Sequence, residues 1–94
     1  RRKYWQAQGL IELEQSAFAA ALSDGDSEHQ RSAYFRLAVY HGRTLYILRS
    51  ALNAGRQALA SAAMRNLASL HRAMTQMHKQ APHHVPIALV LDRH

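Results

Sequence analysis

Hydrophobic residues recur every three or four positions along most of the chain, which is the spacing of one face of an α-helix. They fall into three runs, which predict helices over residues 3–22, 28–53 and 56–80. The turn-forming residues SDGDS separate the first two runs. Gly55, within NAG, separates the second and third, because glycine readily adopts the left-handed conformation that ends helices. A single helix running through Gly55 is the alternative.

The central predicted helix carries the widest apolar surface. Ser27, followed three residues later by Gln30, has the spacing of a capping box at its start. A heptad-spaced seam typical of packed helix pairs follows; it consists of Tyr34, Ala38, His41, Leu45, Leu48 and Leu52. A second row, made of Phe35, Val39, Gly42 and Tyr46, lies beside it. Three short helices cannot easily cover so wide a face, so we expect a second chain to cover part of it.

The fold class that follows is all-α: one domain over residues 1–94, with three helices that form a helical homodimer. A chain of 94 residues buries only roughly 60–65% of its unfolded surface, so a lone monomer would be marginally stable. The interface that we expect combines apolar residues of the last two helices and of the C-terminal tail: Leu45, Leu48, Leu52, Leu67, Leu70, Met74, Ile87 and Leu89.

The tail PHHVPIALVLDRH departs from the helical pattern. Pro82 ends the third helix, because the residue before a proline disfavours helix. Residues 83–94 are predicted to be extended, and an extended segment cannot satisfy its own backbone hydrogen bonds. The tail could pair with the same tail of a second subunit, pack as an arm over the helices, or add to the sheet of a partner.

Charge is distributed unevenly along the chain. The formal net charge is +6, and no acidic residue occurs from His29 to Leu91. Such a field attracts anionic partners, either nucleic acid or an acidic protein face. Arg65, Arg72 and Lys79 could track phosphates along one face of the third helix, although a plain solvated face has the same pattern. A GC-rich genome would also favour arginine.

The sequence gives little support for catalysis or for a cofactor. It lacks a nucleophile elbow and a glycine-rich phosphate loop, and its acidic residues lie mainly in the first helix and the following turn. His71 and His78 share a helix face but are about 10.5 Å apart along it, which is too far for one metal ion unless the tail or a second chain supplies further ligands. His41 is either a neutral, hydrogen-bonded core residue or a pH switch. We therefore expect no enzyme, no cofactor and no metal.

The location that we expect is cytoplasmic. The chain has no cysteine, which suits a reducing compartment. No apolar run approaches the ~20 residues of a membrane span, so we expect no membrane partner.

Protein recognition is the remaining possibility. Arg36, Tyr40, Arg43 and Ile47 form a mixed strip on the central helix, and tyrosine and arginine are enriched at binding hot spots. Tyr4 and Trp5 form a second candidate contact near the N-terminus. The alternative is that Tyr40 and Ile47 pack beneath the first helix or at the dimer contact.

The stretches YFRLAVYHGRTLYILRSAL and LASAAMRNLASLHRAM, in a small, basic, cysteine-free chain, resemble the helical quorum-sensing antiactivators of proteobacteria. The resemblance covers most of the chain and implies a bacterial regulator of transcription. Such a protein is a helical dimer that binds a LuxR-type transcription factor and blocks its dimerisation or its binding to DNA. The alternative is a basic helical protein that binds nucleic acid.

Overall fold

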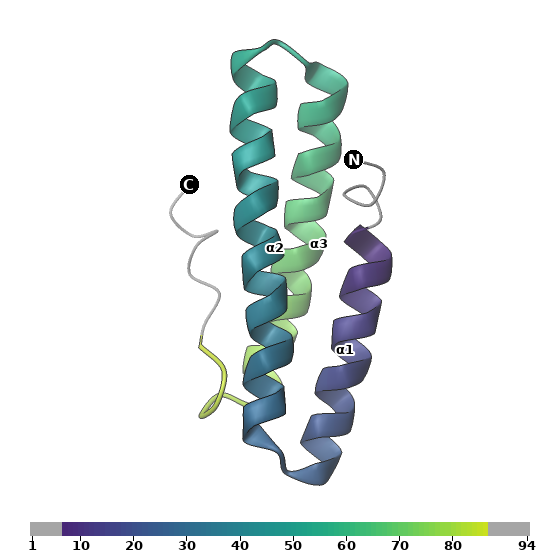
Figure 1. Ribbon diagram of the computed structural model, residues 1–94, viewed down its shortest axis with the longest axis vertical. Helices are drawn as coiled ribbons and strands as arrows, with labels where there is room; N and C mark the ends of the chain where they lie inside the picture. Colours follow the sequence, from purple (N-terminus) through teal and green to yellow (C-terminus); the bar gives the residue numbers. More distant parts are fainter. Residues whose placement is uncertain (1–6, 87–94) are drawn as a thin grey trace.

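Three helices make up the part of the chain that the computed structural model describes, residues 7–86. They are α1 (Ala7–Asp24), α2 (Ser27–Asn53) and α3 (Gln57–Gln80), and no strand occurs in that range. The long helices α2 and α3 form an antiparallel hairpin, and α1 packs along the half of the hairpin that lies away from the α2–α3 turn (Figure 1). The all-α fold with a long central helix, predicted from the sequence, is confirmed.

The breaks between helices lie at two glycines with positive φ, Gly25 at 68° and Gly55 at 70°. At Gly55 the amide of Arg56 donates to the carbonyl of Ala51 at 2.8 Å, which closes the end of α2. The prediction of two separate helices is therefore correct, and the single helix through Gly55 is not formed. The first helix ends at Asp24, two residues later than predicted, while its predicted start at residue 3 lies outside the described residues.

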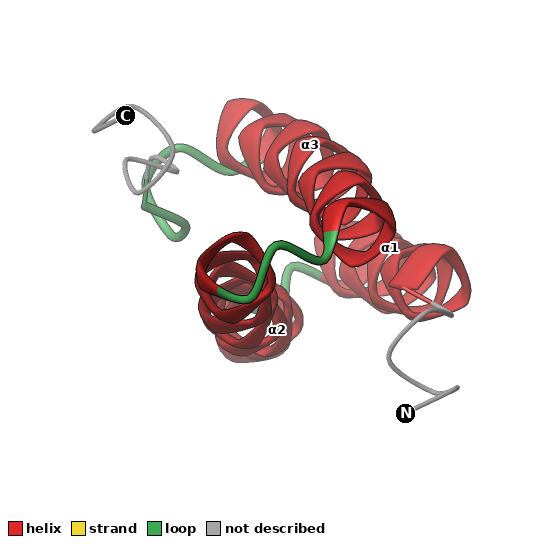
Figure 2. Cartoon of the chain, turned by 90° about the horizontal axis from the view of Figure 1, so that it is seen from above, coloured by secondary structure: helices red, strands yellow, loops and turns green. Residues whose placement is uncertain are grey.

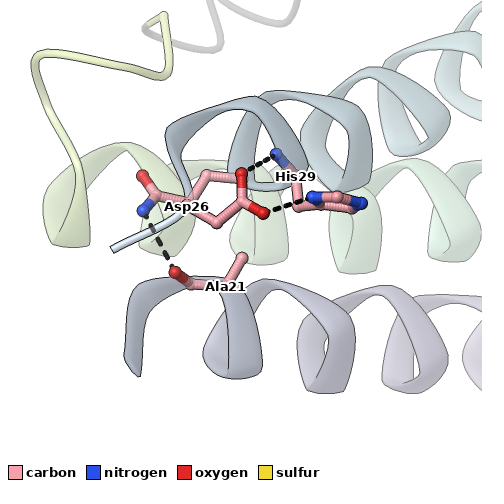
Figure 3. Close-up of polar contacts among 4 residues, drawn as sticks. Ala21, Asp26 and His29 are labelled. Atoms are coloured by element: carbon pink, nitrogen blue, oxygen red, sulfur yellow. Dashed lines mark hydrogen bonds and ion pairs between the residues drawn. The ribbon is translucent and has the colours of Figure 1, made fainter. Parts of the chain in front are cut away.

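The start of α2 differs from the predicted capping box by one residue. Asp26, not Ser27, is the N-cap, and its carboxylate accepts from the backbone N–H of His29 at 3.1 Å. The ring of His29 bonds to the second oxygen of the same carboxylate (Figure 3). The side chain of Gln30 instead donates to the carbonyl of Ala21 at 3.4 Å. Gln30 thus ties α2 to α1 and does not reach back to the cap, which is why the capping-box prediction is wrong.

The core is built from one face of each helix and closed by the chain after α3. Its largest fully buried side chains include Phe18 of α1, Leu37 of α2, and Leu70 and Met74 of α3. Residues 82–84 form a turn, so the chain is not yet extended at residue 83, where we predicted it to be. That turn brings Val85 into the core, where only 2% of it is exposed. Of the helices in residues 7–86, none combines the length and the apolar character needed to cross a membrane.

Candidate protein-binding surface

The predicted strip on α2 contacts α1 at one of its residues, Arg36. Nε of Arg36 donates to Oε2 of Glu14 at 2.9 Å, and Glu14 is only 4% exposed. Tyr40 is partly buried against the core cluster, and Ile47 is half-buried. Tyr40 therefore packs within the chain, as the alternative interpretation held. Arg43 remains exposed, whereas Tyr4 and Trp5 lie outside the described residues.

The outer face of α2 carries the apolar row that was expected to be covered. Phe35 is 65% exposed, Val39 is 41% exposed and Tyr46 is 70% exposed. These residues recur at spacings of three or four residues or their sums, so they share one face. Both α1 and α3 pack against other faces of α2, which leaves this row to solvent within residues 7–86.

We call Phe35, Val39 and Tyr46 the outer row. Three exposed arginines surround it. Arg31 precedes Phe35 by four residues, Arg43 follows Val39 by four, and Arg49 follows Tyr46 by three. Tyrosine and arginine are enriched at protein-binding hot spots, and aromatic residues in general are enriched at protein interfaces. From the sequence, this row belongs to the wide face that a second chain would cover, but Phe35, Val39 and Tyr46 were not among the predicted partner-binding residues. Their arginine neighbours at i±3 and i±4 were a signal that could have identified them.

The residues predicted for a dimer interface fall into three groups. Leu67, Leu70 and Met74 are buried by the chain's own helices, so this arrangement leaves them almost no surface for a second chain. Leu45 and Leu48 are half-buried and Leu52 is 61% exposed. Ile87 and Leu89 lie outside the described residues.

An apolar groove runs between α2 and α3 near the Gly55 turn. Its volume is about 480 Å³, and it is lined by Leu45, Leu48, Arg49, Leu52, Met64, Leu67 and Ala68. Apart from the rim residue Arg49, this lining offers no ionisable group, so the groove has no chemistry for acid–base catalysis. It is suited to apolar side chains.

The histidines are dispersed. Within residues 7–86, no three histidine, aspartate or glutamate side chains gather closely enough to hold a metal ion. Nδ1 of His78 lies 2.8 Å from the carbonyl oxygen of Val85, and His41 is buried in the seam of α2. The buried Nδ1 of His71 has no hydrogen-bond partner among the described residues.

Two groups have shifted pKa values. The backbone N–H of His29, and then its side chain, donate hydrogen bonds that lower the pKa of Asp26 below 3.8. Burial raises the pKa of Tyr34 above 10.0. Both shifts have structural causes, a helix cap and a core tyrosine, and neither group lies in the outer row or lines the groove.

No protein-family model matches the chain, and no curated protein or solved structure shows significant similarity to it.

Proposed function

We propose that this chain is a non-enzymatic, cytoplasmic regulator that binds another protein through the outer row of α2. The observation that supports this function best is the exposure of Phe35 and Tyr46, at 65% and 70%, on a rigid helix. Large apolar side chains so exposed on a small domain mark an interaction surface when they adjoin one another. An aromatic residue on a helix also loses little conformational entropy on binding, because its backbone is already ordered and its side chain has only two rotatable bonds.

The partner that fits this surface is a protein with an apolar groove and an acidic rim. Phe35 and Tyr46 would enter the groove, as the anchor residues of a recognition helix do. Arg31, Arg43 and Arg49 would face carboxylates, and guanidinium groups form forked hydrogen bonds with carboxylates. In its most concrete form, following the resemblance, the partner is a LuxR-type transcription factor. Binding would block its dimerisation or its grip on DNA.

The experiment pairs binding with a promoter readout. A purified LuxR-type activator, loaded with its autoinducer, is titrated with this protein by calorimetry, and its target promoter drives a reporter in the same host. The double variant Phe35→Ser, Tyr46→Ser should lose binding and restore the reporter. Leu13→Ser is the matched control, because Leu13 is 64% exposed but lies on α1. Equal repression by the wild type and the double variant would reject the outer row.

A homodimer is part of the proposal, although the enclosure of Leu70 and Met74 changes where a second copy could contact the chain. The outer row and the groove are two apolar surfaces that the described residues offer to a second copy. Light scattering over a range of protein concentrations tests self-association. If Phe35→Ser, Tyr46→Ser also turns a dimer into a monomer, the row joins two copies of the chain.

Nucleic acid remains the second candidate, because Arg65, Arg72 and Lys79 are all exposed along the outer side of α3. Phosphate contacts release counterions, so binding of this kind weakens steeply with salt. A gel shift on random duplex and single-stranded DNA at low salt distinguishes the two functions. Binding that is lost on substitution of these three residues, but not on Phe35→Ser, Tyr46→Ser, would favour nucleic acid.

A further inference from the structure

The side of the α2–α3 hairpin opposite α1 has one closed end and one open end. On α2, the positions 34, 38, 45 and 52 share a face, since they are spaced by four and seven residues. Tyr34, at the closed end, is 8% exposed, whereas Leu52, at the open end, is 61% exposed. On α3 the same side runs from His78 at the closed end to Met64, which is 57% exposed, at the open end.

The chain that follows α3 covers the closed end of the hairpin. Val85 packs into the core cluster that includes Tyr34, and its carbonyl oxygen lies 2.8 Å from Nδ1 of His78. In Figure 1 this yellow end of the described chain lies beside α2, on the side away from α1. The view from above places it on the same side (Figure 2). The seam of α2 is thus covered where Val85 lies, and toward the Gly55 turn it becomes half-buried at Leu45 and exposed at Leu52.

We propose that residues 87–91 of the same chain occupy the open apolar groove. Their sequence is IALVL, which is wholly apolar, and it follows directly after Val85 and Pro86. The groove lined by Leu48, Leu52 and Met64 accepts apolar side chains of this kind. Filling it removes these apolar surfaces from water, which is favourable.

The segment is long enough to reach the groove from Val85. His78 and Met64 are separated by about 21 Å along α3, at 1.5 Å per helical residue. Residues 86–91 span about 20 Å in extended form, at ~3.3 Å per residue. Leu91 therefore reaches the level of Met64 when Val85 is anchored at His78. Pro86 favours this route, because the residue before a proline disfavours helix and adopts extended conformations.

His71 provides a second, independent indication. It lies two helical turns before His78 on the same face of α3, about 10.5 Å away. Its Nδ1 is buried and has no hydrogen-bond partner within residues 7–86, whereas Nδ1 of His78 pairs with the carbonyl of Val85. An extended chain advances about 10 Å in three residues, so the backbone near Ala88 would pass His71 and supply the missing partner.

Methionine oxidation tests the proposal, because the three methionines divide between the groove and the core. Met64 lines the groove, while Met74 and Met77 are 1% and 2% exposed. The full chain and its Leu89→Asp variant are treated with dilute hydrogen peroxide, and sulfoxide at each position is followed by peptide mass spectrometry. We expect Met64 to oxidise several-fold faster in Leu89→Asp, with Met74 and Met77 unchanged.

His94→Asp is the matched control, because it adds the same charge beyond the apolar segment. It should leave the oxidation rate of Met64 at the wild-type value. Equal rates for Met64 in wild type and Leu89→Asp would overturn the proposal. Protection that grows with protein concentration would also overturn it, since the segment in the groove would then belong to a second copy.

Cysteine cross-linking gives a second measurement should Leu89→Asp unfold the chain, which fast oxidation of Met74 would reveal. The protein has no cysteine, so the pair Met64→Cys, Val90→Cys reports one proximity alone. We expect a disulfide within one chain, formed faster than in the control pair Ala19→Cys, Val90→Cys, whose first residue is exposed on α1. A disulfide that joins two chains, or no difference from the control pair, would reject docking within the chain.

Discussion

Arg36 on α2 and Glu14 on α1 form an ion pair in which one partner is exposed and the other is buried. The Nε–Oε2 distance is 2.9 Å, and the side-chain exposures are 52% for Arg36 and 6% for Glu14. Glu14 lies in the apolar stripe of α1, and its second oxygen has no hydrogen-bond partner within residues 7–86. The pair therefore ties α1 to α2 through a buried carboxylate.

Removal of the arginine should destabilise the fold more than removal of an exposed arginine usually does. Arg36→Ala leaves a buried carboxylate without its charged donor, which costs about 1–3 kcal/mol of unfolding free energy. Arg65→Ala, an exposed arginine on α3, is the control and should change stability by about 0.5 kcal/mol or less. Urea unfolding followed by circular dichroism measures both. The double variant Glu14→Leu, Arg36→Leu should recover most of the loss, since it leaves no buried charge.

The cap of α2 should make stability depend on acid pH. The pKa of Asp26 is lower in the folded chain than the 3.8 of an unperturbed aspartate, because His29 donates hydrogen bonds to the ionised carboxylate. The stabilisation is therefore fully present above the unfolded pKa and is lost as the pH falls through the lower, folded value. Asp26→Asn should lower the melting temperature by a few degrees at neutral pH, and the difference from wild type should shrink toward about pH 2.

Asp24→Asn is the control for this titration, because it removes the same charge from an exposed position two residues earlier. For Asp24→Asn, the difference in melting temperature from wild type should not shrink as the pH falls. A melting-temperature gap for Asp26→Asn that stayed constant from neutral to strongly acid pH would show that the carboxylate does not act through its charge.

Tyr34 should make the stability of the fold depend on alkaline pH as well. Burial raises its pKa above 10.0, so the folded state holds the phenol proton more tightly than the unfolded state does. The corresponding stability is present below the unfolded pKa and is lost as the pH rises through the folded value. The stability of Tyr34→Phe should therefore fall less steeply with rising pH than that of the wild type. Thermal unfolding from about pH 8 to pH 11 checks this, with the exposed Tyr46→Phe as control.

The helices and their breaks were predictable from the sequence because they depend on local spacing. Apolar residues at intervals of three and four, with Gly55 between two such runs, determine α2 and α3 almost to the residue. The capping box failed because Asp26 and Ser27 are both good caps, and the contact between Gln30 and Ala21 is tertiary. The spacing of residues along the sequence does not predict a tertiary contact of this kind.

The candidate site was harder to predict, because α2 is apolar on more than one side. The heptad seam and the row containing Phe35 and Tyr46 look alike in the sequence, and only the placement of α1, α3 and Val85 decides which is covered. Glu14 lies within the apolar stripe of α1, and a buried carboxylate needs a cationic or hydrogen-bonding partner. Which of the many arginines would meet it depended on the angle between α1 and α2.

Substitution by alanine should change the stability of the chain in opposite directions at two glycines. Gly55 has a φ of +70°, a region that costs an L-amino acid about 1–2 kcal/mol, so Gly55→Ala should destabilise the chain although its Cβ would meet nothing within 4 Å. Gly42 lies inside α2 with open space around its missing Cβ, so Gly42→Ala should stabilise the helix by about 0.5–1 kcal/mol. Paired urea titrations measure both changes. If Gly55→Ala proved as stabilising as Gly42→Ala, the α2–α3 turn would not require the left-handed conformation.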